Sequence, residues 1–535
     1  MTGAHAAQFV FVVLLLVVVA FGALAQRLRV PYPLVLLVAG LLVSFIPGLP
    51  SATLDPDVIF FVILPPLLYG AAWNTPWREF SHNLVSITSL AVGLVAFTVA
   101  GVAAVAGWIA PGFDWRIGFL LGAVVSPTDA IAATSIARNM GLPRRIVDVL
   151  EGESLVNDAT GLLAVEMGVL LLTWGEIPPA SFVLFRLGYL VACGIGVGLV
   201  LGLVVDWFER RIDDGPIEIA ISVLVPYGAY LIADAIHASG VLAVVAAGLY
   251  LGRRSTYFFS PTVRLQAYSV WNALTFTLNG LVFVLIGLQL PVVVAGIQKA
   301  GLGTMVLAGA ALSAVVIGLR VVWVFPGARL SYFIRRRLLG QTELIPGPRQ
   351  LLVVGWAGMR GVIALAAAMA LPRTLAEGTA FPQKNAIVFF TFCVIVATLL
   401  FQGLTLPPLI RLLGLDTPPG PDCEEKEARR IVLESALSRL EQIRAGGSDA
   451  MAPVFEDLAQ HYRQRLASLD GTATGDRDVH RASREVSREL LRVERDSAIR
   501  LRDERRINDE VLREIEHDLD LREARMPAAG PQRRP

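Results

Sequence analysis

Apolar runs about 20 residues long recur along most of this sequence, and a helix of that length crosses the hydrocarbon core of a bilayer. Of the 535 residues, 55% are hydrophobic, and the mean hydropathy is +0.61. A soluble chain of this length would instead divide into domains with charged surfaces. The pattern therefore predicts an all-α membrane protein with about thirteen transmembrane helices over residues 1–414, followed by a charged helical tail over residues 415–535.

The positions of the arginines predict the orientation of the chain. Cytoplasmic loops are enriched in Lys and Arg, and most loop arginines fall on one side when the N-terminus is placed outside. The first apolar run, residues 9–25, ends in small residues as a signal peptide does, but Arg27 and Arg29 follow it instead of preceding it. We therefore expect a true first helix, an outside N-terminus and a cytoplasmic tail, in the plasma membrane of a bacterium (its inner membrane).

Polar residues interrupt three of the predicted spans, at 117–137, 146–173 and 350–371. The interruptions read Ser-Pro-Thr-Asp at 126–129, Gly-Glu-Ser-Leu-Val-Asn-Asp at 152–158 and Gly-Met-Arg-Gly at 358–361. With a rise of 1.5 Å per residue, Thr128, Asp158 and Arg360 all lie near the middle of their spans. Because intramembrane charges are costly, such residues are expected to face a partner or a water-filled cavity.

The spacing of the two carboxylates on the second of these spans suggests two different roles. Glu153 and Asp158 are separated by about 140° around a helix, so they face different neighbours, whereas Ser154 and Asp158 share a face. We predict that Arg360 neutralises one carboxylate permanently and that the other takes a mobile cation. Pro127 removes a backbone donor and breaks its helix, and the glycines around Arg360 weaken the other span. Paired interruptions of this kind in two inverted repeats are typical of a transporter site.

The side chains near the two interruptions are suited to a small hard cation. Na⁺ and Li⁺ prefer oxygen ligands, which Asp158, the hydroxyl of Ser154 and the hydroxyl or carbonyl of Thr128 can supply. Low dielectric disfavours the charged form of a carboxyl group, so a proton can compete with the cation for Asp158. If only the loaded forms cross the membrane, this competition produces exchange of a cation for a proton.

The sequence resembles the monovalent cation:proton antiporters, in the branch shared by bacterial sodium/proton antiporters and animal sodium/proton exchangers. The resemblance covers about residues 8–412. The motifs that carry it are Leu-Pro-Pro-Leu-Leu at 64–68, Ser-Pro-Thr-Asp-Ala at 126–130, Gly-Glu-Ser-Leu-Val-Asn-Asp at 152–158, Ser-Gly-Val-Leu-Ala at 239–243 and Gly-Met-Arg-Gly at 358–361.

The resemblance implies a sodium/proton antiporter fold, with a dimerisation domain, a moving core domain and two crossed, discontinuous helices. The same resemblance implies a homodimer, and we expect no cofactor. The residue roles that it implies are a proton and cation carrier at Asp158, a hydrogen-bonding neighbour at Asn157, a buried ion pair between Glu153 and Arg360, cation ligands at Thr128 and Ser154, and an acid at Asp129 that neutralises a helix end. The Asn-Asp pair at 157 and 158 implies electroneutral exchange of one cation for one proton.

One position departs from the family pattern and leaves the ion choice open. Many members carry Glu shortly after Leu-Pro-Pro-Leu-Leu, but here Tyr69 and Gly70 follow, so position 70 supplies no carboxylate; water or Tyr69 is a conceivable substitute. Alternatives to Na⁺/H⁺ or Li⁺/H⁺ exchange are K⁺/H⁺ exchange on the same fold and a cation channel. An enzyme is disfavoured because the sequence contains none of the common hydrolase motifs, and the net charge of +1 gives no indication of a nucleic-acid partner.

Several other charged residues are assigned structural positions. Glu166 is expected to be an acid in the outer vestibule, and Asp234 and His237 are expected near an outer helix end. Arg186 and Arg320 are predicted to lie near the ends of spans at 181–205 and 301–325 and to extend their charges to the membrane surface. In the tail, we expect helices near residues 431–443 and 477–524, a linker at 415–421 and disorder over 526–535. The tail is interpreted as a solvated helical hairpin, with regulation of transport or dimer contact as the alternative.

Overall fold

The computed structural model describes the chain in segments and divides it into two units, Met1–Pro418 and Pro419–Pro535. Most of the predicted linker and the residues from 523 onward lie outside the described residues. The described residues are 3–28, 30–46, 55–110, 112–175, 179–297, 301–341, 345–374, 381–415, 423–445, 452–470, 477–504, 506, 511–512, 515, 519–520 and 522.

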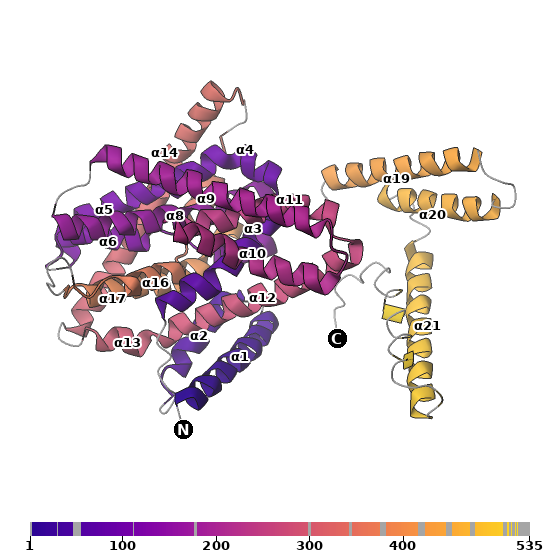
Figure 1. The fold of residues 1–535 in the computed structure, drawn as a ribbon, viewed down its shortest axis with the longest axis horizontal. Coiled ribbons are helices and arrows are strands. Elements are labelled where there is room, and N and C mark those ends of the chain that lie inside the picture. The colour runs from indigo at the N-terminus through magenta and orange to yellow at the C-terminus, as the bar shows by residue number, and fades with distance from the viewer. Residues whose placement is uncertain are drawn as a thin grey trace. The chain divides into compact units, whose positions relative to one another are not determined.

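The first unit is built of helices (Figure 1). Among the described residues, short π-helical segments are continuous with α-helices: η1 with α3, η2 with α4 and α5, and η4 with α17 and α18. The bounds are α1 Gly3–Leu28, α2 Tyr32–Val43, η1 Val58–Ile63, α3 Leu64–Asn74, α4 Trp77–Thr88, η2 Ser89–Leu94, α5 Val95–Ile109, α6 Trp115–Val125, α7 Ala130–Asn139, α8 Arg144–Trp174, α9 Ala180–Glu209, α10 Gly215–Ala235, α11 Gly240–Phe258, α12 Pro261–Leu288, α13 Leu290–Ala295, α14 Leu302–Leu338, α15 Pro348–Trp356, α16 Val362–Ala370, α17 Lys384–Ala397, η4 Thr398–Gln402 and α18 Gly403–Leu412.

Many of these helices have the length and composition of membrane spans. Among the described residues, eight are long and apolar enough to cross a bilayer, or nine if the bent pair of α6 and α7 forms one span. The number thirteen therefore stays a prediction. The largest difference from the predicted limits is at α14, which continues to Leu338 instead of ending near residue 325.

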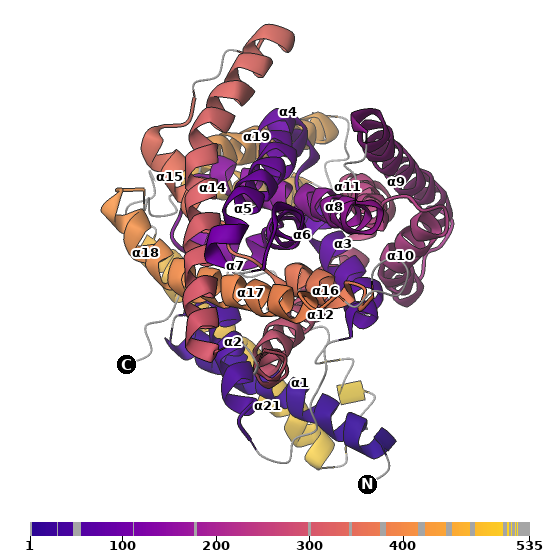
Figure 2. The same ribbon diagram turned by 90° about the vertical axis from the view of Figure 1, so that its left-hand side faces the viewer.

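Packing in the first unit gathers around two hydrophobic clusters. The larger one draws on α1, α2, α5, α6, α12, α14 and α17, and the smaller one on α3, α10 and α11. Helices α9 and α10 pack along α11 on one side, while α14 lies against α5, α15 and α17 (Figure 2). The central helix α8 contacts α4, α6, α7 and α11. The polar side chains of Glu153, Asn157 and Asp158 on α8 are therefore buried inside the unit.

The helices of the second unit whose bounds are described are α19 Cys423–Ala445, α20 Ala452–Asp470 and α21 Arg477–Asp503, and several described residues between 511 and 522 are also helical. Helices α19 and α20 pack against each other as a hairpin, with an ion pair of 3.0 Å between Arg444 and Glu456. Helix α21 ends before the predicted limit at residue 524. A helical tail was predicted, but its division into the separate helices α19, α20 and α21 was not.

Candidate functional site

Two helix breaks meet in the centre of the first unit. Residues 126–129 separate α6 from α7, which are bent by 41° relative to each other, and residues 357–361 separate α15 from α16. The backbone N–H of Asp129 donates to the carbonyl of Met359 at 2.8 Å, so the breaks are in direct contact. The N–H of Arg360 donates to the Thr398 hydroxyl at 3.1 Å. The predicted crossing of two discontinuous helices is thus present.

Local chemistry explains the first break. Pro127 cannot donate a backbone hydrogen bond, and the Ser126 hydroxyl donates to the carbonyl of Ala123 at 2.9 Å, which satisfies an acceptor at the end of α6. The carboxylate of Asp129 accepts from the N–H of Ile131 at 2.8 Å and caps the start of α7. This is the helix-end position expected for Asp129, where a negative charge is favourable.

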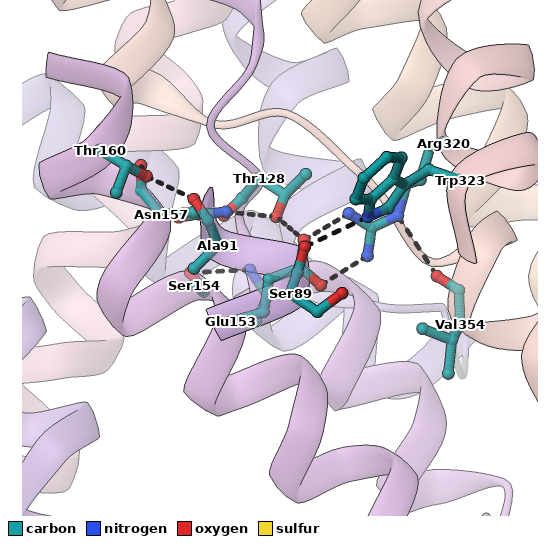
Figure 3. Close-up of polar contacts among 11 residues, drawn as sticks. Ser89, Ala91, Thr128, Glu153, Ser154, Asn157, Thr160, Arg320, Trp323 and Val354 are labelled. Carbon is teal, nitrogen blue, oxygen red and sulfur yellow. Dashed lines mark hydrogen bonds and ion pairs between the residues drawn. The ribbon is translucent and has the colours of Figure 1, made fainter. Parts of the chain in front are cut away.

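A chain of buried polar contacts links α14, α8 and the first break (Figure 3). Arg320 forms a bidentate ion pair with Glu153, with 2.8 Å between Nη2 and Oε2. The Thr128 hydroxyl donates to Glu153 Oε1 at 2.8 Å and accepts from Asn157 Nδ2 at 2.6 Å. All four side chains are at most 5% exposed. The network fixes the unwound segment to α8.

The predicted ion pair between Glu153 and Arg360 is wrong, because the partner of Glu153 is Arg320. Arg320 is 1% exposed and lies at the midpoint of α14, so it does not extend to the membrane surface. The error came from the predicted end of this helix near residue 325, which placed Arg320 close to a terminus. Its side chain also donates to the carbonyl of Val354 at 3.3 Å.

Arg360 is buried in the same region but is not an observed partner of Glu153. It is 0% exposed, and its Nε and Nη1 atoms have no hydrogen-bond partner within the described part of the chain. Arg360 therefore contributes positive charge beside the crossing, while its backbone is held by Thr398.

Asp158 differs from Glu153 in having no such partner. It is 3% exposed, and within the described residues its carboxylate forms no hydrogen bond or ion pair. It lines a cavity of ≈ 730 Å³ together with Thr128, Asp129 and Ser154. The cavity also reaches Arg138 and Glu151, which form an ion pair of 2.6 Å near the start of α8. A buried carboxylate in a polar cavity can be satisfied by a proton or a cation.

The predicted ligands Thr128 and Ser154 lie close to Asp158 but already carry protein contacts. The Ser154 hydroxyl accepts from the N–H of Ala130 at 3.3 Å. The Thr128 carbonyl accepts from Asn157 Nδ2 at 3.3 Å. Each oxygen has a second lone pair for a cation. Asn157 Oδ1 is buried without a partner within the described residues.

Other residues singled out from the sequence lie outside this cavity. Glu166 accepts from Arg186 Nε at 3.1 Å, and Arg186 also donates to the carbonyl of His237 at 3.0 Å. The charges of Glu166 and Arg186 are therefore paired with each other. Tyr69 does not line the cavity; it packs against Trp73 and Trp271. Tyr69 therefore does not take the place, in the cavity, of the carboxylate that position 70 lacks.

The sequence interpretation misplaced Arg320 and did not identify Thr398 or Asn279. Asn279 also lines the cavity. For Arg320 a signal existed, since it stands inside a long apolar run. Thr398 and Asn279 are single polar residues in apolar helices, and only the packing of distant segments identifies them.

Comparisons with known proteins show which sequences and which fold this chain is similar to. The family described as sodium/hydrogen exchanger, transmembrane, matches residues 12–412. An uncharacterised Na⁺/H⁺ exchanger of Mycobacterium tuberculosis is 35% identical over 97% of this chain and 96% of its own. A sodium, potassium, lithium and rubidium/H⁺ antiporter of Bacillus pumilus is 31% identical over 86% of this chain and 69% of its own. The sodium proton antiporter MjNhaP1 from Methanocaldococcus jannaschii, solved at pH 8, has a similar fold, with a TM-score of 0.61 at 20% identity over 77% of this chain and 100% of that one.

Proposed function

Because the chain belongs to the sodium/hydrogen exchanger family, we propose that it exchanges Na⁺ or Li⁺ for H⁺ by alternating access, with Asp158 as the shared carrier. The observation that supports this most directly is the contrast between two carboxylates on one helix. Glu153 is held by Arg320, whereas Asp158 faces the cavity and pairs with no basic side chain in the described part of the chain.

The chemistry follows from mutual exclusion at Asp158. A proton and an alkali cation both neutralise the carboxylate, and each removes the cost of a buried negative charge. Thr128 and Ser154 add neutral oxygens on the cation's side. One oxygen of Asp129 already accepts a hydrogen bond as the cap of α7, and Glu153 is neutralised by Arg320. Among these acids, Asp158 is therefore the carboxylate that remains for transport. This supports electroneutral exchange of one cation for one proton.

K⁺ is the second candidate cation. The antiporter of Bacillus pumilus that resembles this chain is named for sodium, potassium, lithium and rubidium, and position 70 lacks the carboxylate found in many relatives. Fewer charged ligands discriminate less strongly in favour of the smaller ion. We further propose that the protein is a homodimer in the plasma membrane with an outside N-terminus and a cytoplasmic tail.

The test uses purified protein in liposomes that contain a pH-sensitive dye. We expect saturable proton movement when Na⁺ or Li⁺ is added, with K⁺ as the comparison. Asp158→Asn should abolish this signal, while Glu166→Gln, on the same helix but outside the cavity, should retain it. A channel would instead conduct the cation at a rate that changes when the membrane potential is clamped with potassium and valinomycin. Undiminished proton movement in Asp158→Asn would refute the assignment.

A further inference from the structure

The cavity that contains Asp158 is lined by one face of α7 and one face of α8. On each helix the lining residues recur every three or four positions, which is the spacing of residues on a single helix face. They are Ile131, Thr134, Ser135 and Arg138 on α7, and Glu151, Ser154, Leu155 and Asp158 on α8. The cavity therefore follows both helices from Asp158 to the ion pair of Arg138 and Glu151.

The exposure of these side chains shows where the cavity opens. The side chain of Arg138 is 63% exposed and that of Glu151 is 19% exposed, whereas Asp158 is 3% exposed. Glu151 and Asp158 are seven residues apart on one continuous helix, so about 10 Å separates them along its axis. Arg138 and Glu151 thus lie at a mouth of the cavity, and Asp158 lies at depth. In the proposed orientation, this mouth is cytoplasmic.

At this mouth, Arg138 holds the carboxylate of Glu151, with 2.6 Å between Nη2 and Oε1. Side chains on a helix lean towards its N-terminus, so Arg138, near the C-terminal end of α7, leans back towards the cavity. Among the described residues that line the cavity, the charged ones are Asp129, Arg138, Glu151 and Asp158. The pair itself carries no net charge, and removal of either partner leaves one charge at the mouth.

The position of this ion pair suggests a role other than stabilisation. An ion pair with so exposed an arginine contributes little to the free energy of unfolding, because water screens it and both side chains lose freedom. A charge at the mouth of a cleft, in contrast, changes the local concentration of ions there, and salt weakens this effect. A lone carboxylate at position 151 would concentrate cations at the entrance, and Arg138 suppresses that attraction.

We propose that the pair of Arg138 and Glu151 is an electrostatic filter, which sets the apparent affinity for alkali cations that enter the cavity through this mouth. Glu151 attracts the cation and Arg138 opposes it. The pair acts through the concentration of cations at the entrance and leaves the ligands around Asp158 unchanged. This inference rests on the proposed cation/proton exchange.

The test measures Na⁺/H⁺ exchange in membrane vesicles of both orientations, at low ionic strength and at an alkaline pH where protons compete little for Asp158. Arg138→Gln removes the partner of Glu151 and should lower the apparent KM for Na⁺ about three- to fivefold. Glu151→Gln leaves the arginine alone and should raise this KM by a similar factor. The double variant restores a neutral mouth and should lie close to the wild type.

The control is Arg186→Gln, which breaks an ion pair with Glu166 on the same helix α8 but outside the cavity. Its KM for Na⁺ should equal that of the wild type. Thermal melts of all four variants in detergent should stay close to the wild type, so that a changed KM does not come from unfolding.

Two further readouts separate a filter from a structural contact. Addition of choline chloride should bring the KM values of the wild type and both single variants together, because salt screens the charge at the mouth. A lower pH, at which H⁺ and Na⁺ compete directly, should also bring them together, because a charged mouth concentrates both cations alike. The changes in KM should be larger when Na⁺ is added on the face where Arg138 is exposed.

The inference is wrong if Arg138→Gln and Glu151→Gln shift the KM in the same direction, if neither shifts it, or if both faces respond equally. Wild-type exchange would stand in each of these cases. Absence of cation-dependent proton movement in the wild type would instead overturn the proposed function itself.

Discussion

At the scale of single residues, the partner of each buried charge decides which groups are free to bind ions. Glu153 is neutralised by Arg320, and Thr128 adds a hydrogen bond to the same carboxylate. Asp158, five residues further along α8, has no such contact among the residues that the structure describes. The sequence predicted this difference between the two carboxylates from their angular separation, but it named the wrong arginine, because hydropathy does not fix helix ends well enough to place a residue in depth.

The corrected ion pair predicts the stability of arginine variants. Arg320→Ala leaves Glu153 buried without its cation and should destabilise the protein by about 3–5 kcal/mol. Arg360→Ala should cost clearly less, because no ion pair of Arg360 is observed within the described residues. Arg329→Ala, an exposed position on α14, is the control. Thermal melts in detergent that show Arg360→Ala to be the more damaging change would contradict the pairing.

A double-mutant cycle tests the same contact independently. Glu153→Gln and Arg320→Gln should each lower the melting temperature, and the double variant should lose much less than the sum, because neither charge is then left unpaired. Additive losses would mean that the two side chains do not interact in the folded protein.

At the scale of elements, the crossing of the two helix breaks positions the site. Pro127 and the glycines of residues 355–361 were sufficient to predict both interruptions. The bond from Asp129 to Met359 and the support of Arg360 by Thr398 could not be predicted, because they join segments more than thirty residues apart in an apolar background. Asn279, which lines the cavity from α12, was missed for the same reason.

The second break should be sensitive to a single methyl group. A Cβ atom on Gly358 would lie 2.1 Å from Cδ and 2.4 Å from Nε of Arg320. Since Arg320 is held by Glu153, Gly358→Ala should destabilise the protein by about 1–3 kcal/mol through overpacking and lower exchange activity. Gly318→Ala on α14 is the control, because its Cβ would meet no atom within 4 Å. Equal melts and equal exchange rates for the two variants would contradict this view of the crossing.

At the scale of the whole molecule, competition at one carboxylate predicts how transport depends on pH. The cation requires a deprotonated Asp158, as metal ligands in general require loss of a proton. The apparent KM for Na⁺ should therefore rise as the pH falls, by up to about tenfold per pH unit where protonation is extensive, while the maximal rate changes little. A KM that is constant across the acid range, measured in liposomes with equal pH on both sides, would contradict competition.

Electroneutral exchange is a second property of the whole molecule. With one transport carboxylate per chain, the loaded forms carry the same charge whether they hold H⁺ or Na⁺. Clamping the membrane potential with potassium and valinomycin should leave the exchange rate unchanged. A rate that rises or falls systematically with the clamped potential would require a second ionisable carrier, for which Asp129 would be the first candidate.

The most direct test of the central claim is the release of protons when the cation binds. Na⁺ is added to purified, weakly buffered protein in detergent, at a pH where Asp158 is largely protonated, and the released protons are counted with a pH indicator. The account predicts close to one proton per chain for the wild type and for Glu166→Gln, and none for Asp158→Asn. Sodium binding without proton release in the wild type, or unchanged release in Asp158→Asn, would contradict it.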